Sequence, residues 1–488
     1  MDALIPADFG LVLDPSTRVA RVGRILIGGT PFRIVRLSRD HAAALAAWRQ
    51  GEPVGDNEER RRFARALVAS NLAQPRPPTR ALKRDVDAVV PVRDRPRQLH
   101  RLLGALTGLP DSEYVREVVV VDDASSDQDL TARVVEDGLG RLVRCTEWGG
   151  AAAARNSGAA ATTAPFIAFL DSDCVPEDGW LAAVLPHFAD PLVGAVAPRV
   201  VGLAERGPGW VACYEDVRSP LDRGTQSGRV LPRSRVPFVP GVALVVRRTA
   251  LDAGFDETLP GGEDVDYVWR LTEKGWHVRY ESTGRVQHEH RTSLGSWLSR
   301  RAHYGRTAAP LDRRHHAAAR PLAVSPWTAA AWAAALLRQP FAATAITGTA
   351  CALLARELTG VVDQPVREAV RLAGGGTLRS GPHVADALTR TWWPATLAVA
   401  ALRPRLRLPL AAAALVPALL EWRHSRPPLD PVRWTLARLM DDAAYGFGVW
   451  SGCWTQGEWG PLWPDFGWRL IIETSEELVA ATQSTQPR

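Results

Sequence analysis

Two runs of consecutive apolar residues in the middle of the chain end abruptly in acidic residues. Residues 118–121 lead directly into Asp122 and Asp123, and residues 166–170 lead into Asp171 and Asp173. A strand that is apolar on both faces is typical of the interior of a parallel sheet, and ligands of such sheets collect beyond the carboxyl ends of the strands. The pattern predicts that both acidic pairs face one crevice.

Strand and helix patterns alternate around these two runs. The predicted order is a strand at 86–92, a helix at 96–106, a strand at 118–121, a helix at 131–138, and then a further strand, helix and strand leading to Asp171. Such alternation predicts an α/β fold with a doubly wound sheet and right-handed crossovers. We expect this domain to cover residues 85–305.

A smaller pattern precedes this domain. Residues 9–70 read as three short strands (17–22, 24–27 and 32–37) followed by helices at 40–49 and 57–67, with Ser38 and either Asn57 or Glu58 at the helix starts. This predicts a small α+β, winged-helix-like module over residues 1–72. The proline-rich segment 73–84 lacks apolar periodicity and is expected to be a linker.

Beyond residue 306 the composition shifts to Ala, Leu, Trp and Arg. The apolar runs there are 326–337, 341–355, 392–402 and 408–420, and arginines such as Arg338 and Arg403 interrupt them. Each run is shorter than the roughly 20 residues that cross a bilayer. We expect a helical region over 306–488, which either packs on the sheet or lies at a membrane surface.

Charge and cysteine content narrow the functional classes. The net charge of +6 is accompanied by no recognised nucleic-acid motif, so no nucleic-acid partner is expected. The five cysteines lie far apart without C-x-x-C spacing, which argues against a zinc site and against a disulfide framework. No signal peptide is recognised at the amino terminus, so the chain is expected in the cytoplasm, with a peripheral place at the inner face of the cell membrane as the alternative.

The D-x-D pair at the end of the second apolar run has a specific chemical use. Asp171 and Asp173 would place hard oxygen ligands on one side of Mn²⁺ or Mg²⁺, and such ions combine one or two carboxylates with substrate phosphates. A nucleoside diphosphate is the natural third component of this site.

Seven short patterns occur in order along the central domain. They are DVDAVVPVRDR from Asp85, VDDAS from Val121, ARNSG from Ala154, FLDSD from Phe169, GFDE from Gly254, GGEDVD from Gly261 and WRL from Trp269. Over residues 86–291 this order resembles the inverting, nucleotide-sugar-dependent glycosyltransferases of family 2, which have a GT-A fold. The expected fold class is therefore a GT-A nucleotide-sugar-binding sheet.

The resemblance implies roles for individual residues. The nucleoside would contact the turn at Pro91, Arg93 and Asp94 and the pair Asp122 and Asp123. Arg155 would pair with phosphate or with Asp171, and Asn156 would support the metal loop. Asp171, Asp173 and His288 would hold the cation, and Asp171 would also reach the ribose or sugar. Asp264, beside Glu263, would be the general base, and Gly262, Trp269 and Arg270 would line the substrate site.

Structural interpretations compete with several of these roles. One of Asp122 and Asp123 could instead cap the following helix, and Arg155 could form an ordinary salt bridge. Glu263 and Asp264 could simply be helix-start charges stabilised by the helix dipole, with Asp266 placed in the same way. A lone histidine such as His288 is often only a hydrogen-bonded structural residue.

The three-part arrangement of module, family 2 domain and Arg/Trp-rich helical tail resembles the mycofactocin glycosyltransferases of actinobacteria. This implies transfer of glucose from UDP-glucose to a peptide-derived redox cofactor as a β-linked chain, with a precursor peptide at the amino-terminal module. Three alternatives remain: a transferase acting on a cell-wall or lipid-linked acceptor at the membrane, a nucleotidyltransferase, and a non-catalytic peptide-binding scaffold. The segment from Pro91 to Arg95 lacks the glycine-rich loop that a nucleotidyltransferase needs.

Overall fold

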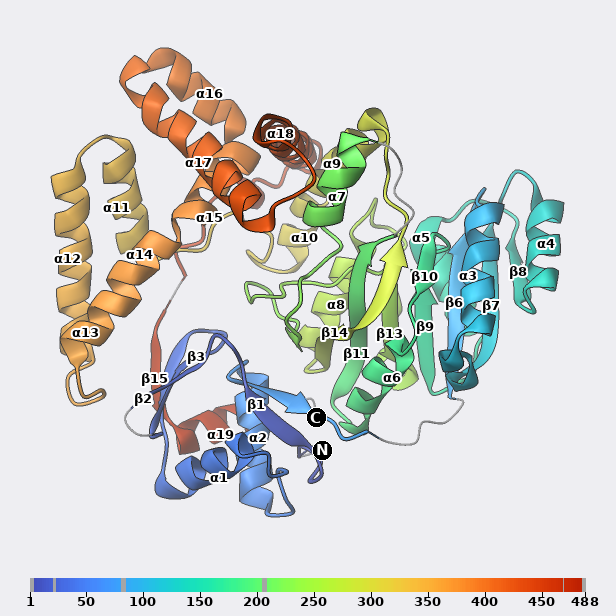
Figure 1. Cartoon of the computed structure of the whole chain (residues 1–488), viewed down its shortest axis with the longest axis horizontal. Helices are drawn as coiled ribbons and strands as arrows, with labels where there is room; N and C mark the ends of the chain where they lie inside the picture. Colours follow the sequence, from blue (N-terminus) through green and yellow to red (C-terminus); the bar gives the residue numbers. More distant parts are fainter. Residues whose placement is uncertain (1–3, 21–22, 80–84, 204–208, 468, 485–488) are drawn as a thin grey trace. The chain divides into compact units, whose positions relative to one another are not determined.

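The computed structural model of the protein describes residues 4–20, 23–79, 85–203, 209–467 and 469–484 (Figure 1). The chain divides into two compact units. The sheet unit comprises residues 1–205, 218–290 and 471–488, and the helical unit comprises residues 206–217 and 291–470. Both ends of the chain therefore belong to the sheet unit.

The sheet unit is built on a nine-stranded sheet with the order β10-β14-β11-β13-β9-β6-β7-β8, in which β12 pairs with β14. The strands are β6 (Val86–Val92), β7 (Val115–Asp123), β8 (Arg141–Cys145), β9 (Phe166–Leu170), β10 (Cys174–Pro176), β11 (Val193–Gly202), β12 (Gly228–Arg229), β13 (Ala243–Arg247) and β14 (His277–His288). Strands β9, β6, β7 and β8 are parallel, whereas β13 runs antiparallel to β9 and to β11. The predicted α/β class is confirmed, with a mixed sheet.

Several helices lie between the strands of the nine-stranded sheet along the chain. They are α3 (Pro96–Gly108), α4 (Gln128–Asp137), α5 (Gly150–Ala160), α6 (Trp180–Val184) and α8 (Glu263–Glu273). Helix α5 packs very closely against β6, because a Cβ on Gly158 would lie only 2.3 Å from Cγ1 of Val89. Val89, Val120 and Phe169 are fully buried beneath these helices. This close packing holds the start of α5 against the strand ends.

The amino-terminal module combines both ends of the chain. Its strands are β1 (Gly10–Leu13), β2 (Arg18–Ala20), β3 (Ile25–Gly28), β4 (Arg33–Arg36) and β5 (Ala73–Arg76), and its helices are α1 (Arg39–Arg49) and α2 (Glu58–Ala69). Ser38 and Asn57 cap the two helices, as the sequence predicted, by accepting hydrogen bonds from the backbone N–H groups of His41 and Arg60.

The module differs from the sequence prediction at both of its borders. Residues 73–76, expected in the linker, form β5 and pair with β1, while residues 80–84 of that linker and residues 21–22 of the predicted strand lie outside the described residues. The end of the chain forms β15 (Ile471–Thr474), parallel to β4, and α19 (Ser475–Ser484), which packs on α2. Leu478 of α19 is 1% exposed in the module core, so the module is completed from the far end of the chain.

A buried ion pair joins the module to the large sheet. Arg65 of α2 donates to both carboxylate oxygens of Asp190, at 2.8 and 2.6 Å, and both side chains are almost completely buried. A bidentate arginine–carboxylate pair fixes orientation as well as distance. It therefore holds α2 in a defined register against the segment that leads into β11.

The helical unit contains the four apolar runs as helices. Its helices are α7 (Trp210–Arg218, through residue 217), α9 (Leu294–Arg306), α10 (Ala308–Arg314), α11 (Pro326–Leu336), α12 (Pro340–Glu357), α13 (Pro365–Ala369), α14 (Gly375–Arg379), α15 (Gly381–Asp386), α16 (Trp393–Leu402), α17 (Arg407–Ser425) and α18 (Pro431–Gln456). Among the described residues, none of the helices is both long and apolar enough to cross a bilayer.

Close helix contacts and buried charges hold the centre of the helical unit together. Helices α9 and α18 touch at Gly305 and Gly448, where an added Cβ would lie 2.0 Å from a backbone oxygen of the other helix. Beside this contact, Arg301 of α9 pairs with Asp441 of α18 at 2.8 Å and also with Glu215 of α7. The three helices therefore form one packed core, in which Trp297 and Trp434 are fully buried.

Candidate active site

The carboxyl ends of β6, β7 and β9 bring the two acidic pairs to one edge of the sheet. Val92 of β6 lies opposite Asp122 of β7, and Pro91 lies opposite Val121. Strand β9 runs parallel to β6 on its other side and ends at Leu170, immediately before Asp171. The strand ends that carry the two acidic pairs therefore lie at one edge of the sheet, with β6 between the two acidic strands.

The loop after β6 is fastened to the loop after β7. Asp94 has a positive φ of 55°, and its Oδ1 accepts hydrogen bonds from both the backbone N–H and the hydroxyl of Ser126, each at 2.7 Å. The Ser126 hydrogen bonds lower the pKa of Asp94. Arg93 lies 5.2 Å from the centre of the Trp148 ring. The turn predicted to contact the nucleoside is thus built by Asp94, while Arg93 and Trp148 form an exposed cation–π pair beside it.

Asp122 and Asp123 have different environments. Both oxygens of Asp123 accept backbone N–H groups at the start of α5, from Gly149 at 2.8 Å and Gly150 at 2.9 Å. Asp122 Oδ1 accepts from the Ser125 N–H at 3.0 Å, but its Oδ2 is buried and has no hydrogen-bond partner. Asp123 therefore anchors the helix start, and Asp122 keeps an acceptor for a ligand.

Arg155 of α5 connects the end of β9 with the start of α8. One terminal nitrogen donates to Asp171 Oδ1 and the other to Glu263 Oε1, both at 2.8 Å. Burial by itself lowers the pKa of Arg155, yet the charges of Asp171, Glu263 and Asp264 raise it above its ordinary value. The guanidinium is 3% exposed and permanently charged. Because Arg155 contacts both Asp171 and Glu263, it holds the predicted metal loop close to the predicted general base, Asp264, which follows Glu263.

Asp264 is the second residue of α8, which begins directly after Gly262, whose φ of 75° is left-handed. Its Oδ2 accepts from the Gly241 N–H at 2.7 Å, and its Oδ1 accepts from the Val265 N–H at 2.8 Å. Burial raises the pKa of Asp264, and the neighbouring Glu263 carboxylate adds to that rise. A carboxylate with a raised pKa is a better proton acceptor, which is what a general base requires.

Three residues predicted to bind substrate are engaged with the protein instead. The Asn156 amide donates to the Phe255 carbonyl and accepts from the Phe255 N–H, at 2.8 and 2.9 Å. Trp269 is 4% exposed and donates to the Pro237 carbonyl, and Arg270 donates to Asp266 and to the Gly254 carbonyl. These side chains position the 254–257 turn and α8.

Asp173 and His288 are brought together by the pairing of β10 with β14, in which Cys174 lies opposite His288. His288 Nε2 is 3.5 Å from Asp173 Oδ1, and both Asp173 Oδ1 and His288 Nδ1 are buried without a hydrogen-bond partner. The Asp173 carboxylate and the His288 imidazole, each with one buried atom that has no hydrogen-bond partner, fit a divalent cation that takes its other ligands from a diphosphate.

The third predicted ligand, Asp171, is paired with an arginine. Asp171 is occupied by Arg155, and within the described residues no three His, Cys, Asp or Glu side chains are close enough together to hold a metal ion by themselves. The protein alone therefore supplies an incomplete coordination shell. That is the usual condition where substrate phosphates complete it.

Arg95 is a site residue that the sequence reasoning missed. Its guanidinium pairs with Asp173 Oδ2, so the carboxylate predicted to hold the cation is shared with an arginine from the β6–α3 loop. The Arg95 side chain is 39% exposed. Its position two residues after Arg93 and directly before Pro96, at the start of α3, was the available signal.

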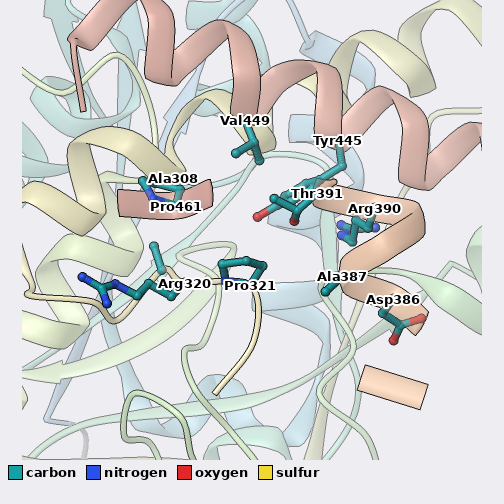
Figure 2. Close-up of a pocket in the computed structure, with 11 residues that line it drawn as sticks. Ala308, Arg320, Pro321, Asp386, Ala387, Arg390, Thr391, Tyr445, Val449 and Pro461 are labelled. Carbon is teal, nitrogen blue, oxygen red and sulfur yellow. The ribbon is translucent and has the colours of Figure 1, made fainter. Parts of the chain in front are cut away.

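A cavity of about 180 Å³ lies in the helical unit and contains none of these residues. Tyr445 and Val449 of α18 line it from one side, and Arg320 and Pro321 lie across from them (Figure 2). Ligand pockets usually enclose about 300–1,000 Å³, so this cavity is too small for a nucleotide sugar. The strand-end site remains the candidate.

Known proteins are similar to this chain over its central domain and over nearly its whole length. Residues 87–255 match the family described as Glycosyl transferase family 2. The pre-mycofactocin glycosyltransferase of Mycobacterium tuberculosis, from two strains, is 37% identical over 482 residues, which is 94% of this chain and 98% of the relative. Validoxylamine A glucosyltransferase of Streptomyces hygroscopicus subsp. limoneus is 30% identical over 220 residues, covering 39% of this chain and 48% of that protein.

A solved structure is also similar. A mannosyltransferase from Pyrobaculum calidifontis in complex with GDP-Man and Mn²⁺ is 21% identical, with 70% of this chain and 96% of that chain covered at a TM-score of 0.37. A TM-score this low supports no conclusion about the present chain.

Proposed function

Because the chain belongs to the pre-mycofactocin glycosyltransferases and carries a family 2 glycosyltransferase domain, we propose that it transfers glucose from UDP-glucose to a peptide-derived acceptor of mycofactocin maturation. The observation that carries the proposal is the Arg155 bridge, which unites Asp171 at the donor side with Glu263 and Asp264 at the acceptor side.

The donor is held by its nucleoside and by its diphosphate. The unpartnered Asp122 Oδ2 accepts a hydrogen bond from the uracil N3–H or from a ribose hydroxyl at the end of β7. The Asp94 turn supports the base, because it is fixed to Ser126 on the neighbouring loop. Arg95 is within reach of Asp173 and therefore of a diphosphate bound there, to which its guanidinium can donate.

Asp173 and His288, with Asp171 beside them, would hold a divalent cation, Mn²⁺ or Mg²⁺. When bound, this ion stabilises the negative charge that develops on the departing diphosphate. Arg155 holds Asp171 in place and offsets the repulsion between the Asp171 and Glu263 carboxylates.

Asp264 provides the base for a single displacement. The acceptor hydroxyl gives its proton to an Asp264 oxygen as its own oxygen attacks the anomeric carbon, while the bond from that carbon to the diphosphate oxygen breaks and UDP leaves. Attack from the face opposite the diphosphate inverts the anomeric configuration, so an α-linked donor gives a β-linked product. The two backbone N–H groups from Gly241 and Val265 aim the Asp264 carboxylate.

The amino-terminal module is the proposed place for a precursor peptide. In its four-stranded sheet β15-β4-β3-β2, the strand β15 occupies one edge, and β2 forms the other edge among the described residues. An extended peptide can add a strand to such an edge through main-chain hydrogen bonds.

A second candidate acceptor is a lipid-linked or cell-wall sugar. The observation that favours it is the large number of exposed apolar side chains in the helical unit, including Phe341 at 90% and Leu402 at 78% exposure. The catalytic residues would be the same for both acceptors, because only the acceptor differs.

The test is product analysis with the purified full-length protein. It is incubated with UDP-glucose, Mn²⁺ and either the peptide-derived acceptor or a polyprenyl phosphate, and products are identified by mass spectrometry and by the anomeric proton couplings in NMR. A β-glucosylated peptide-derived product is the expected result. Sugar found only on the polyprenyl acceptor would replace the first proposal by the second, and an α-linked product would contradict the inverting mechanism.

A further inference from the structure

Two helices of the helical unit are unusually exposed to solvent. Neither α12 nor α16 has a single buried residue, although both are rich in apolar side chains. A helix on the surface of a water-soluble domain normally turns an apolar stripe toward a core and a polar face toward water. The exposure of Leu353 on α12 and of Leu397 and Val399 on α16 departs from that pattern.

Strongly exposed apolar side chains lie where the helices are connected in pairs. Helices α11 and α12 form one hairpin, joined by residues 337–339, and α16 and α17 form another, joined through residues 403–406 (Figure 1). Leu337 is 57% and Phe341 is 90% exposed at the first connection. Leu402 is 78% and Leu408 is 74% exposed at the second. Large apolar side chains thus gather at both hairpin ends.

The same connections carry only positive charge. Arg338 lies in the first, Arg403, Arg405 and Arg407 lie in the second, and neither segment 337–341 nor segment 402–408 contains an acidic residue. All four arginines are exposed. Arginine next to exposed Leu and Phe complements a surface with an apolar interior and anionic phosphates outside. The aliphatic part of the arginine side chain lies on apolar groups, and its guanidinium reaches the phosphates.

We propose that the α11–α12 and α16–α17 hairpins dock on an anionic lipid bilayer, with Leu337, Phe341, Leu402 and Leu408 entering the acyl boundary and the arginines contacting lipid phosphates. The helices lie in the interface and do not cross it. Among the described residues, no helix is both long and apolar enough to cross a bilayer, and the 10 residues of α16 extend only about 15 Å of the roughly 30 Å hydrocarbon core.

Other side chains of the helical unit favour a lipid surface over a second copy of the chain as the binding partner. Trp454 and Trp463 are 78% and 65% exposed, and tryptophan favours the boundary between headgroups and acyl chains. In a symmetric dimer formed through the hairpin ends, equivalent patches would meet, so the arginines of the two copies would face each other without acidic partners. A lipid surface supplies the missing negative charge.

Vesicle flotation of the full-length protein tests the proposal. The protein is mixed with vesicles of phosphatidylcholine alone or of equimolar phosphatidylcholine and phosphatidylglycerol, and the fraction that floats is measured across lipid concentrations. We expect the protein to float with the anionic vesicles and to bind pure phosphatidylcholine at least about tenfold more weakly, because each arginine near an anionic surface contributes about fivefold in affinity.

Two variants separate the apolar from the ionic contribution. The double variant Phe341→Ser with Leu402→Ser is expected to lose flotation on both lipids. The triple variant Arg403→Gln, Arg405→Gln and Arg407→Gln is expected to lose at least about tenfold of the affinity for anionic vesicles only. Leu139→Ser, at an 85% exposed leucine of the sheet unit, is the matched control and should float like the parent protein.

Three results would overturn the proposal. The first is no flotation with anionic vesicles. The second is an equal loss of flotation in the Leu139→Ser control. The third is a dimer in light scattering that the Phe341→Ser, Leu402→Ser variant converts to a monomer without any lipid binding by the parent. None of these measurements involves glycosyl transfer, so the proposal stands or falls separately from the activity.

Discussion

Arg155 shows why the candidate site needs an arginine at one position. Its two terminal nitrogens reach Asp171 and Glu263, which come from different elements and lie in different directions. A guanidinium presents donors in a fixed planar fork, whereas an ammonium is a single point charge on a flexible chain. Without this bridge, two half-buried carboxylates would face each other with no cation between them.

Arg155→Lys is therefore expected to lower kcat/KM by about 100-fold, since the two loops lose their common anchor. It should also lower the free energy of unfolding by about 1.5–3 kcal/mol, because a single ammonium group cannot pair with both half-buried carboxylates at once. Steady-state kinetics and urea unfolding measure the two effects. Arg116→Lys is the control: Arg116 pairs with the fully buried Asp87 near the start of β6, and its replacement should cost stability but leave kcat unchanged.

The raised pKa of Asp264 predicts the direction of the acid limb of the pH profile. Asp264 must be ionised to accept a proton, so kcat/KM should fall as the pH is lowered through its pKa. Because burial raises that pKa, the fall should occur at a higher pH than an ordinary aspartate would give. A pH–rate profile in Mn²⁺-saturated buffer measures this, and a profile flat down to the pKa of an ordinary aspartate would contradict the assignment.

The same shift makes a prediction for stability. A carboxyl whose pKa is raised by folding binds its proton more tightly in the folded state, so the ionised form at neutral pH opposes folding. The loss of this charge favours Asp264→Asn at pH 7, whereas the amide nitrogen of asparagine leaves one of the two backbone N–H groups without an acceptor, so we expect a thermal midpoint close to that of the parent, whatever happens to its activity. A differential scanning measurement at pH 7 checks this, and a drop of many degrees would indicate that the carboxylate is mainly a structural anchor.

Asp173 and His288 should determine the response to metal. Addition of Mn²⁺ with UDP is expected to raise the thermal midpoint of the parent protein, because a ligand that binds only the folded state stabilises it. The shift should vanish with a chelator and in Asp173→Asn, and it should shrink in His288→Ala. Asp178→Asn, in the exposed turn after β10, serves as the control. An undiminished shift in Asp173→Asn would remove this residue from the cation site.

At the residue level, the sequence predicted the acidic residues of the candidate site but not which side chains contact the protein backbone. The order of the motifs located Asp122, Asp171, Asp173 and Asp264 at strand ends and at a helix start, where the structure has them. It could not assign Asp123 to the α5 backbone or Asn156 to the Phe255 backbone. Those contacts join segments up to about a hundred residues apart and depend on tertiary packing. Arg95 was missed for the same reason.

At the level of elements, the turn before α8 depends on a fit between Gly254 and Asn156. Gly254 has a φ of 68°, and a Cβ there would lie 2.4 Å from Asn156 Oδ1. Gly254→Ala should lower stability by about 1–3 kcal/mol and also reduce kcat, because the turn positions Glu263 and Asp264. Gly179→Ala has the same backbone strain at a φ of 78° with no atom within 4 Å, so it should cost less stability and leave kcat unchanged.

The predictability of elements followed the range of the interactions that form them. Local signals predicted the caps Ser38 and Asn57 and the four apolar helices, because side chains a few residues apart determine them. The pairing of β15 with β4 joins residues more than 430 positions apart, and the short segment 471–474 carries no mark of its partner. Likewise, β5 was taken for linker because Pro75 is uncommon in strands.

On the scale of the whole molecule, the proposed catalytic residues and the proposed lipid-docking hairpins lie in different units. The sheet unit carries every predicted catalytic and ligand residue, together with the module that the end of the chain completes. The helical unit carries the exposed apolar hairpins and none of the proposed catalytic groups. Composition alone indicated the helical region, but only the solvent exposure of Phe341, Leu402 and Leu408 favours a surface that meets lipid.

The central claim is that Asp264 accepts the acceptor's proton at a site assembled by Arg155. It is tested most directly by comparing Asp264→Asn with Asp252→Asn, an exposed aspartate paired with Lys274 outside the site. The turnover rate and the calorimetric affinity for UDP with Mn²⁺ are measured for both. We predict that Asp264→Asn loses about 10²–10⁴-fold in turnover while UDP affinity is retained, and that Asp252→Asn matches the parent in both. Parental turnover by Asp264→Asn would contradict the mechanism.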